Sequence, residues 1–448
     1  MAVPATPPEV RALLQDLYHA AVTAAAPGPA LGRALAPHRP ESKRRIFLLA
    51  LGKAAHPMAT AAVERLREWG LDPAGGLIVS PAADPPPHPA LQSLPGNHPF
   101  PGILSFAAAE AVGRVAGQIA PSDEVWVLLS GGTTSLIGAP VAGVEPDDLI
   151  QLYHLLLGSG LDISAMNRIR KRFSRWGGGR LAAALHPARV KNFTISDVIG
   201  DDLAAIGSGP CVPDESSASD VRGALASAGL WEQVPASVRE TLETVLRGQA
   251  PETPKRGDPA FQNLETEIVV SNRLAVEAAQ RRGIELGLAA RVVDTALAGE
   301  AAPTGRRLAQ HLINYSESRP AQPGGPHKDA FCLIWGGETT VTLGADHGLG
   351  GRNQELALAA AEVLAGTPAL TGLLSAGTDG RDGPTEAAGA VVDRETWGRV
   401  RAAGRNPSVD LARHDAFHAL EVAGALLPAE ATGTNVMDIV IGYRGEHA

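Results

Sequence analysis

The sequence of 448 residues has few cysteines and no long apolar run. Its two cysteines, Cys211 and Cys332, provide neither a disulfide framework nor the ligand spacing of a zinc site, and they suit a reducing cytoplasm. No apolar stretch approaches the roughly 18 residues that a membrane-spanning helix requires. The opening segment also lacks the basic and apolar regions of a secretory signal. We therefore predict a cytoplasmic protein with no membrane partner.

Aromatic side chains and positive charge are also scarce. Phe, Trp and Tyr make up 4% of the residues, so alanine, leucine and valine must fill most of the core. The formal net charge is −9, and an acidic protein is repelled by phosphate backbones and anionic lipids. These values exclude nucleic acid and an anionic membrane surface as the main partners. The remaining composition, 44% hydrophobic and 19% charged, is typical of a globular protein.

The chain is long enough for two domains, because a single core rarely grows beyond about 250–300 residues. Apolar, strand-like runs alternate with helical patterns, which predicts an α/β fold throughout. For residues 1–250 we predict a doubly wound, Rossmann-like parallel sheet. For residues 260–448 we predict a second α/β domain with a mixed sheet, beginning at a strand over 268–272. Residues 251–259 are the expected linker, and the final strand, 435–442, could pair with either domain.

Several predicted strands end in loops rich in glycine, hydroxyl and charged residues, which is how open α/β sheets build sites at their carboxyl edge. Lys53 follows the strand 45–51 and opens a helix, where free N–H groups attract an anion. The segment SGGTTS (130–135) follows another strand, and Gly131 and Gly132 permit an N–H nest for phosphate. It matches neither the Walker A loop nor the G-x-G-x-x-G fingerprint. The alternatives are a surface lysine and a tight turn.

An acidic loop begins at the end of the predicted strand 190–196. It reads SDVIGDD and is followed shortly by IGSGP. Mg²⁺ prefers carboxylate oxygens, so one or two of Asp197, Asp201 and Asp202 could hold it on a nucleotide. Ser208 and Gly209 could contact phosphate oxygens. The alternative is an Asx turn combined with helix capping.

Two further glycine-rich segments lie in the second half of the chain. The loop 377–389 places Asp379 and Asp382 beside glycines, and ordering such a loop is costly unless a ligand or a tight turn requires it. The pattern of 336–355 predicts a hairpin, a glycine-rich turn and then a helix carrying Arg352. An arginine at that point suits capture of a carboxylate or a phosphate, and its alternative role is a surface ion pair.

Together and in this order, these motifs resemble the class II glycerate kinases, the glycerate 2-kinases of the MOFRL family. The resemblance implies ATP-dependent phosphorylation of D-glycerate on its 2-hydroxyl group, giving 2-phosphoglycerate and ADP. It also implies two α/β domains with the active site in the cleft between them. The matching segments are LGKAAHPM, LSGGTTSLIGAP, MNRIRKRFSRWGGGRLA, ISDVIGDDLAAIGSGP, GGETTVTLG, GLGGRNQELALAAA, AGTDGRDGPTEAAGAVVD and TGTNVMDIVI.

The resemblance implies roles for individual residues. The family's lysine and key arginine fall on Lys53 and Arg352, and we predict that these two and Asp197 are catalytic, with Asp197 accepting the hydroxyl proton. ATP and Mg²⁺ are the expected cofactors. The predicted contacts are Ser130, Gly131, Gly132, Thr133, Ser208 and Gly209 for nucleotide phosphates, Lys53, Arg352, Asn353 and Thr378 for D-glycerate, and Asp197, Asp201, Asp379 and Asp382 for the metal.

The chain departs from the family pattern near Trp176, where a lysine is usual. Arg175 or Arg180 could supply the charge, with different geometry. Two other functions stay open. One is an NAD(P)H-dependent hydroxypyruvate reductase, a name often carried by proteins that resemble this family, although the dinucleotide fingerprint is absent. The other is a phosphometabolite-binding protein without activity. We expect D-glycerate as the partner, and a homodimer is one open assembly state.

Overall fold

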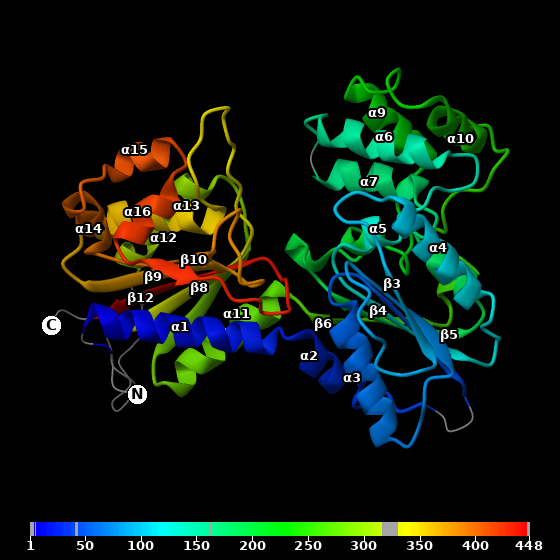
Figure 1. Cartoon of the computed structure of the whole chain (residues 1–448), viewed down its shortest axis with the longest axis horizontal. Helices are drawn as coiled ribbons and strands as arrows, with labels where there is room; N and C mark the ends of the chain where they lie inside the picture. Colours follow the sequence, from blue (N-terminus) through cyan, green and yellow to red (C-terminus); the bar gives the residue numbers. More distant parts are fainter. Residues whose placement is uncertain (1–3, 5, 41–43, 162, 316–329, 446–448) are drawn as a thin grey trace. The chain divides into compact units, whose positions relative to one another are not determined.

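The computed structural model describes residues 4, 6–40, 44–161, 163–315 and 330–445. The chain folds into two compact units (Figure 1). The first unit is residues 27–269, and the second unit is residues 1–26 together with 270–448. This division differs from the predicted one, because the boundary lies near residue 270 and the opening helix belongs with the C-terminal half of the chain.

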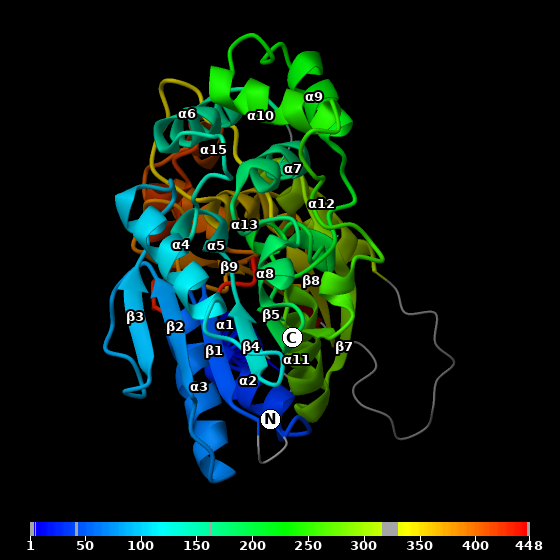
Figure 2. The same cartoon turned by 90° about the vertical axis from the view of Figure 1, so that its right-hand side faces the viewer.

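The first unit contains a six-stranded sheet in the order β3-β2-β1-β4-β5-β6. The pairings of β1 with β2 and β4, of β2 with β3, and of β4 with β5 are parallel, as predicted, and Figure 2 shows these strands side by side. The strand order reverses between β1 and β4, and such a switch point is where doubly wound sheets bind ligands. The strands are β1 (Ile46–Leu51), β2 (Gly75–Ser80), β3 (Leu91–Pro95), β4 (Glu124–Leu129), β5 (Arg189–Ile195) and β6 (Leu264–Val270).

Two strands of this sheet depart from the sequence prediction. β3 lies in a segment that its proline and glycine content predicts to be a loop. It is an edge strand with mostly half-buried residues, so it needs no apolar run. β6 is the opposite edge of the same sheet, whereas the sequence predicts that a strand over 268–272 starts the second domain.

Helices cover both faces of this sheet. On one face α4 and α8 pack against the side chains of Phe47, Leu49 and Val127, which alternate along their strands. On the other face Trp69, which ends α3, contacts the fully buried Trp126 edge-on, with ring centroids 6.3 Å apart. The helices around this sheet are α2 (Pro27–Leu35), α3 (Ala55–Glu68), α4 (Ile103–Ala116), α5 (Thr133–Leu136) and α8 (Arg180–Leu185).

Four other helices of the first unit form a group with its own apolar core (Figure 1). Buried residues recur at helical spacing, for example Leu149, Leu152 and Leu156 in α6. The predicted linker is wrong, because it packs on this unit: Thr253 is buried and its hydroxyl donates to Asp214 (2.9 Å). The helices are α6 (Pro146–Leu157), α7 (Ile163–Phe173), α9 (Ala218–Ser227) and α10 (Ala236–Leu246).

The second unit contains a mixed six-stranded sheet in the order β11-β10-β9-β12-β8-β7, which confirms the predicted class. β12 is antiparallel to β8 and to β9, and β7 is parallel to β8. The final strand therefore pairs within this unit. The strands are β7 (Ala289–Leu297), β8 (Phe331–Gly337), β9 (Leu370–Gly377), β10 (Ala387–Asp393), β11 (Leu426–Pro428) and β12 (Asp438–Gly445).

The hairpin predicted after β8 is wrong. Gly337 adopts a φ of 137°, and a side-chain carbon added there would lie 2.3 Å from the carbonyl oxygen of Leu297. The N–H of Glu338 donates to that same carbonyl oxygen (2.8 Å), and Thr340 forms an isolated parallel bridge with Glu300. The chain therefore follows the end of β7 instead of turning back along β8.

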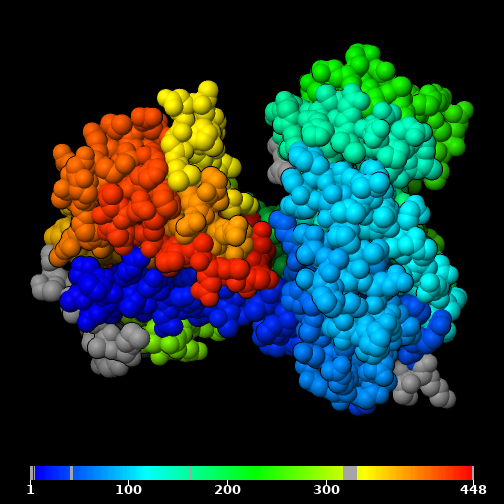
Figure 3. All heavy atoms as spheres, viewed as in Figure 1, coloured from blue at the N-terminus to red at the C-terminus, as the bar shows by residue number. Residues whose placement is uncertain are grey.

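Helices flank the second sheet as well. α1 (Pro7–Ala24) and α11 (Asn272–Glu285) lie on one face, and α12 (Ala301–Asn314) and α13 (Arg352–Leu364) on the other (Figure 1). The hydroxyl of Tyr18 donates to the carbonyl oxygen of Gly377 (2.7 Å), and Figure 3 shows α1 in blue along the C-terminal segments of this unit. No described helix is long and apolar enough to cross a bilayer.

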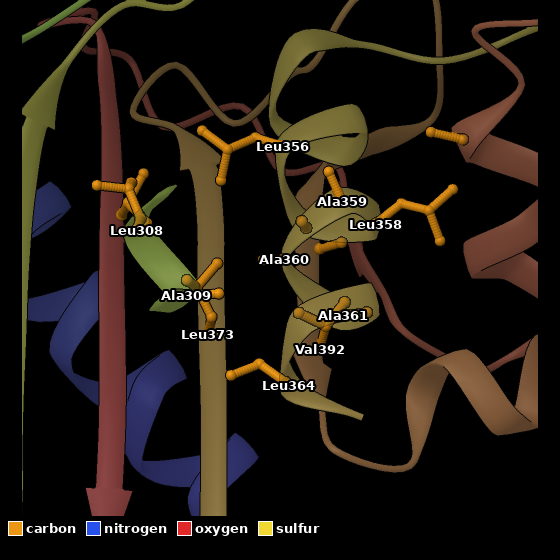
Figure 4. Close-up of a cluster of buried hydrophobic side chains, with 14 of the residues drawn as sticks. Leu308, Ala309, Leu356, Leu358, Ala359, Ala360, Ala361, Leu364, Leu373 and Val392 are labelled. Carbon is orange, nitrogen blue, oxygen red and sulfur yellow. The ribbon is translucent and has the colours of Figure 1, made fainter. Parts of the chain in front are cut away.

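α13 is buried over most of its length. Residues 356–361 are almost fully inaccessible, and Figure 4 shows them within one apolar cluster. A side-chain carbon added at Gly305 of α12 would meet the backbone of Leu356 at 2.1 Å, so small residues let these two helices approach closely. The remaining helices, α14 (Thr396–Ala402), α15 (Pro407–Ala412) and α16 (Ala416–Val422), pack around it. The dense packing fixes the position of Arg352, the first residue of α13.

Candidate active site

The loops after β1 and β4 meet at the switch point of the first sheet. The N–H of Lys53 donates to the carbonyl oxygen of Gly131 (2.9 Å), and the N–H of Ala54 donates to the Ser130 hydroxyl (3.0 Å). Gly52 adopts a φ of 124°, and a side-chain carbon there would lie 2.2 Å from that hydroxyl, so this position requires glycine. The structure thus brings the predicted Lys53, Ser130 and Gly131 together and leaves the lysine side chain exposed.

Asp197, at the end of β5, places its carboxylate over Gly131. A side-chain carbon added at Gly131 would lie 2.0 Å from a carboxylate oxygen, which explains the glycine. Burial raises the pKa of Asp197, and its own backbone N–H and the charge of Lys53 partly offset that shift. A carboxylate with a raised pKa is a stronger base, which suits a group that accepts a proton.

Sequence reasoning missed His98, which lies beside the same loop. A side-chain carbon added at Gly132 would be 3.2 Å from the His98 ring and 3.2 Å from the side chain of Lys53. Desolvation and the charge of Lys53 lower the pKa of His98, so its ring stays neutral over a wider pH range. The available sequence signal was weak: a histidine in a proline-rich loop ahead of a helix.

The turn that contains Ser208 lies next to this edge. Gly207, Ser208 and Gly209 all have left-handed backbones, with φ of 57°, 67° and 59°. The buried Ser208 hydroxyl lies 2.9 Å from the hydroxyl of Thr134, which belongs to the loop after β4. The predicted phosphate-binding segments 130–135 and 206–210 are therefore neighbours. Turns with left-handed residues can direct successive backbone N–H groups toward an anion.

Two other predicted residues of this unit have a more local role. The Thr133 hydroxyl is fully buried beside the carbonyl oxygens of Leu51 and Ser130 (2.9 and 2.8 Å), so it ties two strand ends together. Asp201 is half-buried and has a left-handed backbone, with φ of 57°. Its carboxylate stays a candidate ligand, whereas the Thr133 hydroxyl already has protein partners.

In the second unit, Arg352 holds two carboxylates. Its Nε and Nη2 donate to the two oxygens of Asp438 (2.6 and 2.9 Å), and its Nη1 lies 2.7 Å from Glu338. Burial acts to lower the pKa of Arg352, but the hydrogen bonds and charge of Asp438 and the charge of Glu338 raise it overall. The guanidinium is therefore permanently charged and held in one orientation. Sequence reasoning identified the arginine and missed both of its partners.

Asp382 caps the helix that begins at Arg352. Its carboxylate accepts the backbone N–H groups of Asn353 (3.1 Å) and Gln354 (2.8 Å), two of the donors that a helix start leaves without partners. Burial raises the pKa of Asp382 to about 6, although these hydrogen bonds act to lower it. The side chain of Asn353 is buried and accepts from Ser375 (2.6 Å). These contacts make Asp382 a helix cap, a role that the sequence did not indicate, and give Asn353 a supporting role.

The other two predicted residues of the loop after β9 differ in exposure. The Thr378 hydroxyl is fully buried, donates to the carbonyl oxygen of Met437 (2.7 Å) and accepts the N–H of Val436 (2.8 Å). It therefore joins the start of β12 to the end of β9. Asp379 is exposed and accepts the N–H of Arg381 (3.0 Å), which is an Asx turn.

The acids predicted to bind metal do not form a complete metal site on their own. Among the described residues, no group of three or more His, Cys, Asp and Glu side chains could hold a metal ion. Mg²⁺ in kinases keeps several waters and uses one or two carboxylates with the substrate phosphates, so Asp197 at the glycine loop fits a partial site. Asp382 fits poorly, because both of its oxygens already accept backbone N–H groups.

The segment around Trp176 lies next to the turn at Ser208, because the N–H groups of Gly178 and Gly179 donate to the carbonyl oxygens of Ser208 and Gly209 (both 2.8 Å). The Trp176 ring is buried in the core of the first sheet, and its Nε1 donates to the carbonyl oxygen of Ala109 (3.0 Å). Arg175 pairs with Glu110, and Arg180 donates to carbonyl oxygens at the end of α7. In this structure both arginines therefore have partners of their own.

A cavity of about 370 Å³ lies beside Arg352, within the second unit. Its lining includes the polar residues Glu338 and Thr339. His414 lies 2.8 Å from Glu355 in another part of the lining, and burial raises the pKa of that glutamate. The other lining residues are Thr340, Val341, Leu343, His347, Gly348, Gly350, Gly351, Gly383 and Pro384. The cavity gives a small anion access to the guanidinium.

Comparisons with known proteins find relatives that match nearly the whole chain. Two family models match: a domain of unknown function, DUF4147, over residues 13–243, and the MOFRL family over 331–438. A glycerate 2-kinase of Pyrococcus horikoshii is 36% identical over 401 residues, 90% of this chain and 88% of the relative. A putative hydroxypyruvate reductase of Agrobacterium vitis is 35% identical, covering 96% and 93%. The crystal structure of glycerate kinase from Thermotoga maritima has a TM-score of 0.85 at 34% identity, covering 97% and 99%.

Proposed function

This chain belongs to the class II glycerate kinase family, and from that premise we propose that it phosphorylates D-glycerate on the 2-hydroxyl group with ATP, giving 2-phosphoglycerate and ADP. Phosphoryl transfer depends on positioning and charge neutralisation more than on covalent help from the protein. The observation that carries the proposal is the switch-point cluster, where Lys53, the glycine nest and Asp197 gather at one sheet edge.

In the first unit, the backbone around Gly131 and Gly132 and the turn at Ser208 bind the nucleotide phosphates. Lys53 supplies the positive charge at this edge. Asp197 accepts the proton of the 2-hydroxyl group, because burial makes it more basic than an exposed aspartate. His98, kept neutral by desolvation and by the nearby lysine, is a further donor or acceptor for the substrate.

In the second unit, Arg352 binds the glycerate carboxylate or the migrating phosphoryl group. Asp438 fixes the plane of the guanidinium, so the arginine needs no reorganisation when an anion arrives. Asp197 and Asp201 are the residues that would hold Mg²⁺, with phosphate oxygens completing the site. The metal neutralises phosphate charge when it is bound.

The test is a coupled assay with ATP, Mg²⁺ and D-glycerate, with enolase present and phosphoglycerate mutase absent. An enolase signal identifies 2-phosphoglycerate as the product. ADP formation without that signal assigns phosphorylation to another hydroxyl or another acceptor. Absence of glycerate-dependent ADP contradicts the proposal.

The name of the Agrobacterium vitis relative keeps a reductase as the second candidate. Against it, the loop after β1 lacks the G-x-G-x-x-G pattern that brings a dinucleotide pyrophosphate to a helix N-terminus. Oxidation of NADH or NADPH in the presence of hydroxypyruvate, at a rate above that of the kinase reaction, would establish the reductase instead.

A further inference from the structure

The two carboxylates that pair with Arg352 differ in how freely they can move. Asp438 is the first residue of β12, and its side chain is 4% exposed, so it cannot leave without opening the sheet. Glu338 lies just after β8, in a segment without regular structure, and its side chain is 41% exposed. The first carboxylate is a permanent support for the guanidinium, and the second is exchangeable.

The backbone of Glu338 is fixed, so only its side chain must move. Its N–H donates to the carbonyl oxygen of Leu297 (2.8 Å), and the preceding Gly337 has no room for a side chain. Rotation about side-chain bonds therefore suffices to withdraw the carboxylate from Arg352. Glu338 and Arg352 both line the cavity of about 370 Å³, so the space next to the guanidinium can take another anion.

We propose that Glu338 occupies the place on Arg352 that the anionic group of the substrate takes, and so sets the affinity of the enzyme for that anion. The inference rests on the proposed role of Arg352 in binding substrate. With Nε and Nη2 committed to Asp438, Nη1 is the nitrogen that faces an exchangeable partner. A monocarboxylate such as D-glycerate, or a phosphoryl oxygen, makes the same charge-assisted contact as Glu338.

The exchange accounts for how a half-buried arginine is tolerated. A guanidinium without enough counter-charge in a half-buried place is costly. With Glu338 as the resident partner, the arginine has two carboxylates when substrate is absent. After exchange it still has two anions, so neither state leaves it underpaired.

The test compares Glu338→Gln with Glu362→Gln. Glu362 is a matched control, because it is a 38% exposed glutamate that pairs with Arg306 (2.7 Å) in the same unit, away from the cavity. D-glycerate binding is measured by calorimetry without ATP, and KM and kcat are measured with ATP. We expect Glu338→Gln to tighten glycerate binding and lower its KM about two- to five-fold, the range of an exposed ion pair, with kcat little changed. The control should bind like the parent protein.

Unchanged or weaker glycerate binding in Glu338→Gln would overturn the inference, and weaker binding would make Glu338 a direct ligand of the substrate. Arg352→Gln separates this failure from that of the proposed function. If Arg352→Gln abolishes glycerate binding while Glu338→Gln has no effect, only the competitor role fails. If Arg352→Gln binds normally, the role proposed for the arginine fails as well. In the double variant the effect of Glu338→Gln should disappear.

Discussion

Asp438→Asn tests whether the buried carboxylate positions Arg352 for function. An asparagine keeps the volume but offers one acceptor oxygen in place of two, and it removes the counter-charge. Breaking a fully buried ion pair costs about 3–5 kcal/mol. Because the arginine side chain is 35% exposed and keeps Glu338, we expect a smaller loss of about 1–3 kcal/mol in the free energy of unfolding.

The loss of orientation should act on catalysis beyond its effect on stability. A freed guanidinium can shift by about 1 Å, and such a misplacement lowers rates up to about 100-fold. We therefore expect kcat/KM for D-glycerate to fall by about 10- to 100-fold in Asp438→Asn. The assays are urea unfolding and steady-state kinetics at a temperature where the variant remains folded.

Asp410→Asn is the matched control. Asp410 accepts the same pair of hydrogen bonds from Arg405, one from Nε (3.1 Å) and one from Nη2 (2.8 Å). Its side chain is 11% exposed. Asp410 lies in α15 and Arg405 just before it, and neither residue is in the cavity lining. The control should lose similar stability and keep parental kcat/KM. A normal kcat/KM in Asp438→Asn, or an equal loss in both variants, would refute the positioning role.

Three other changes test the site and its support. Lys53→Ala should lower kcat/KM by orders of magnitude without unfolding the protein, because the side chain is exposed; near-parental turnover would exclude its role. Gly131→Ala should reduce nucleotide binding, measured by calorimetry with ADP, because the added carbon would lie 2.0 Å from the Asp197 carboxylate; unchanged binding would show that the loop adapts. Burial raises the pKa of Asp382 to about 6 from an ordinary 3.8, so its contribution to stability is complete below about pH 4 and is lost as the pH rises through 6. Asp382→Asn should flatten that part of the curve of unfolding free energy against pH, and an unaltered slope would assign the titration to another group.

The strands at the centre of the first sheet could be predicted because they are buried on both faces. β1 and β4 have nearly continuous apolar runs, and the site loops follow the carboxyl ends of these two strands and of β5. β3 could not be found in this way, since an edge strand needs little apolar surface. The prediction of a hairpin after β8 was wrong. The β-branched residues Val341 and Thr342 favour a strand, but the backbone conformation of Gly337 directs the chain away from β8.

The site residues that could be predicted are those that directly follow a strand, and those that depend on distant contacts could not be predicted. Lys53, Gly131 and Asp197 follow strands, so parallel topology predicts that they meet. The contact between Arg352 and Asp438 spans 86 positions and depends on the central place of β12 in its sheet, which no local pattern reveals. Asp382 lies 29 positions from the helix that it caps, so a local capping pattern could not distinguish that role from metal binding.

β12 is the last of the described strands, yet it lies in the middle of its sheet and joins β9 to β8. On the ribosome, residues 27–269 emerge without interruption, whereas α1 must wait for partners such as Thr434, whose hydroxyl bonds to Ala25 across 409 positions. The same strand delivers Asp438, the residue that orients the arginine. A chain that lacks β12 therefore has neither a continuous sheet nor an oriented Arg352, so the anion binding proposed for that arginine requires β12 to have been synthesised.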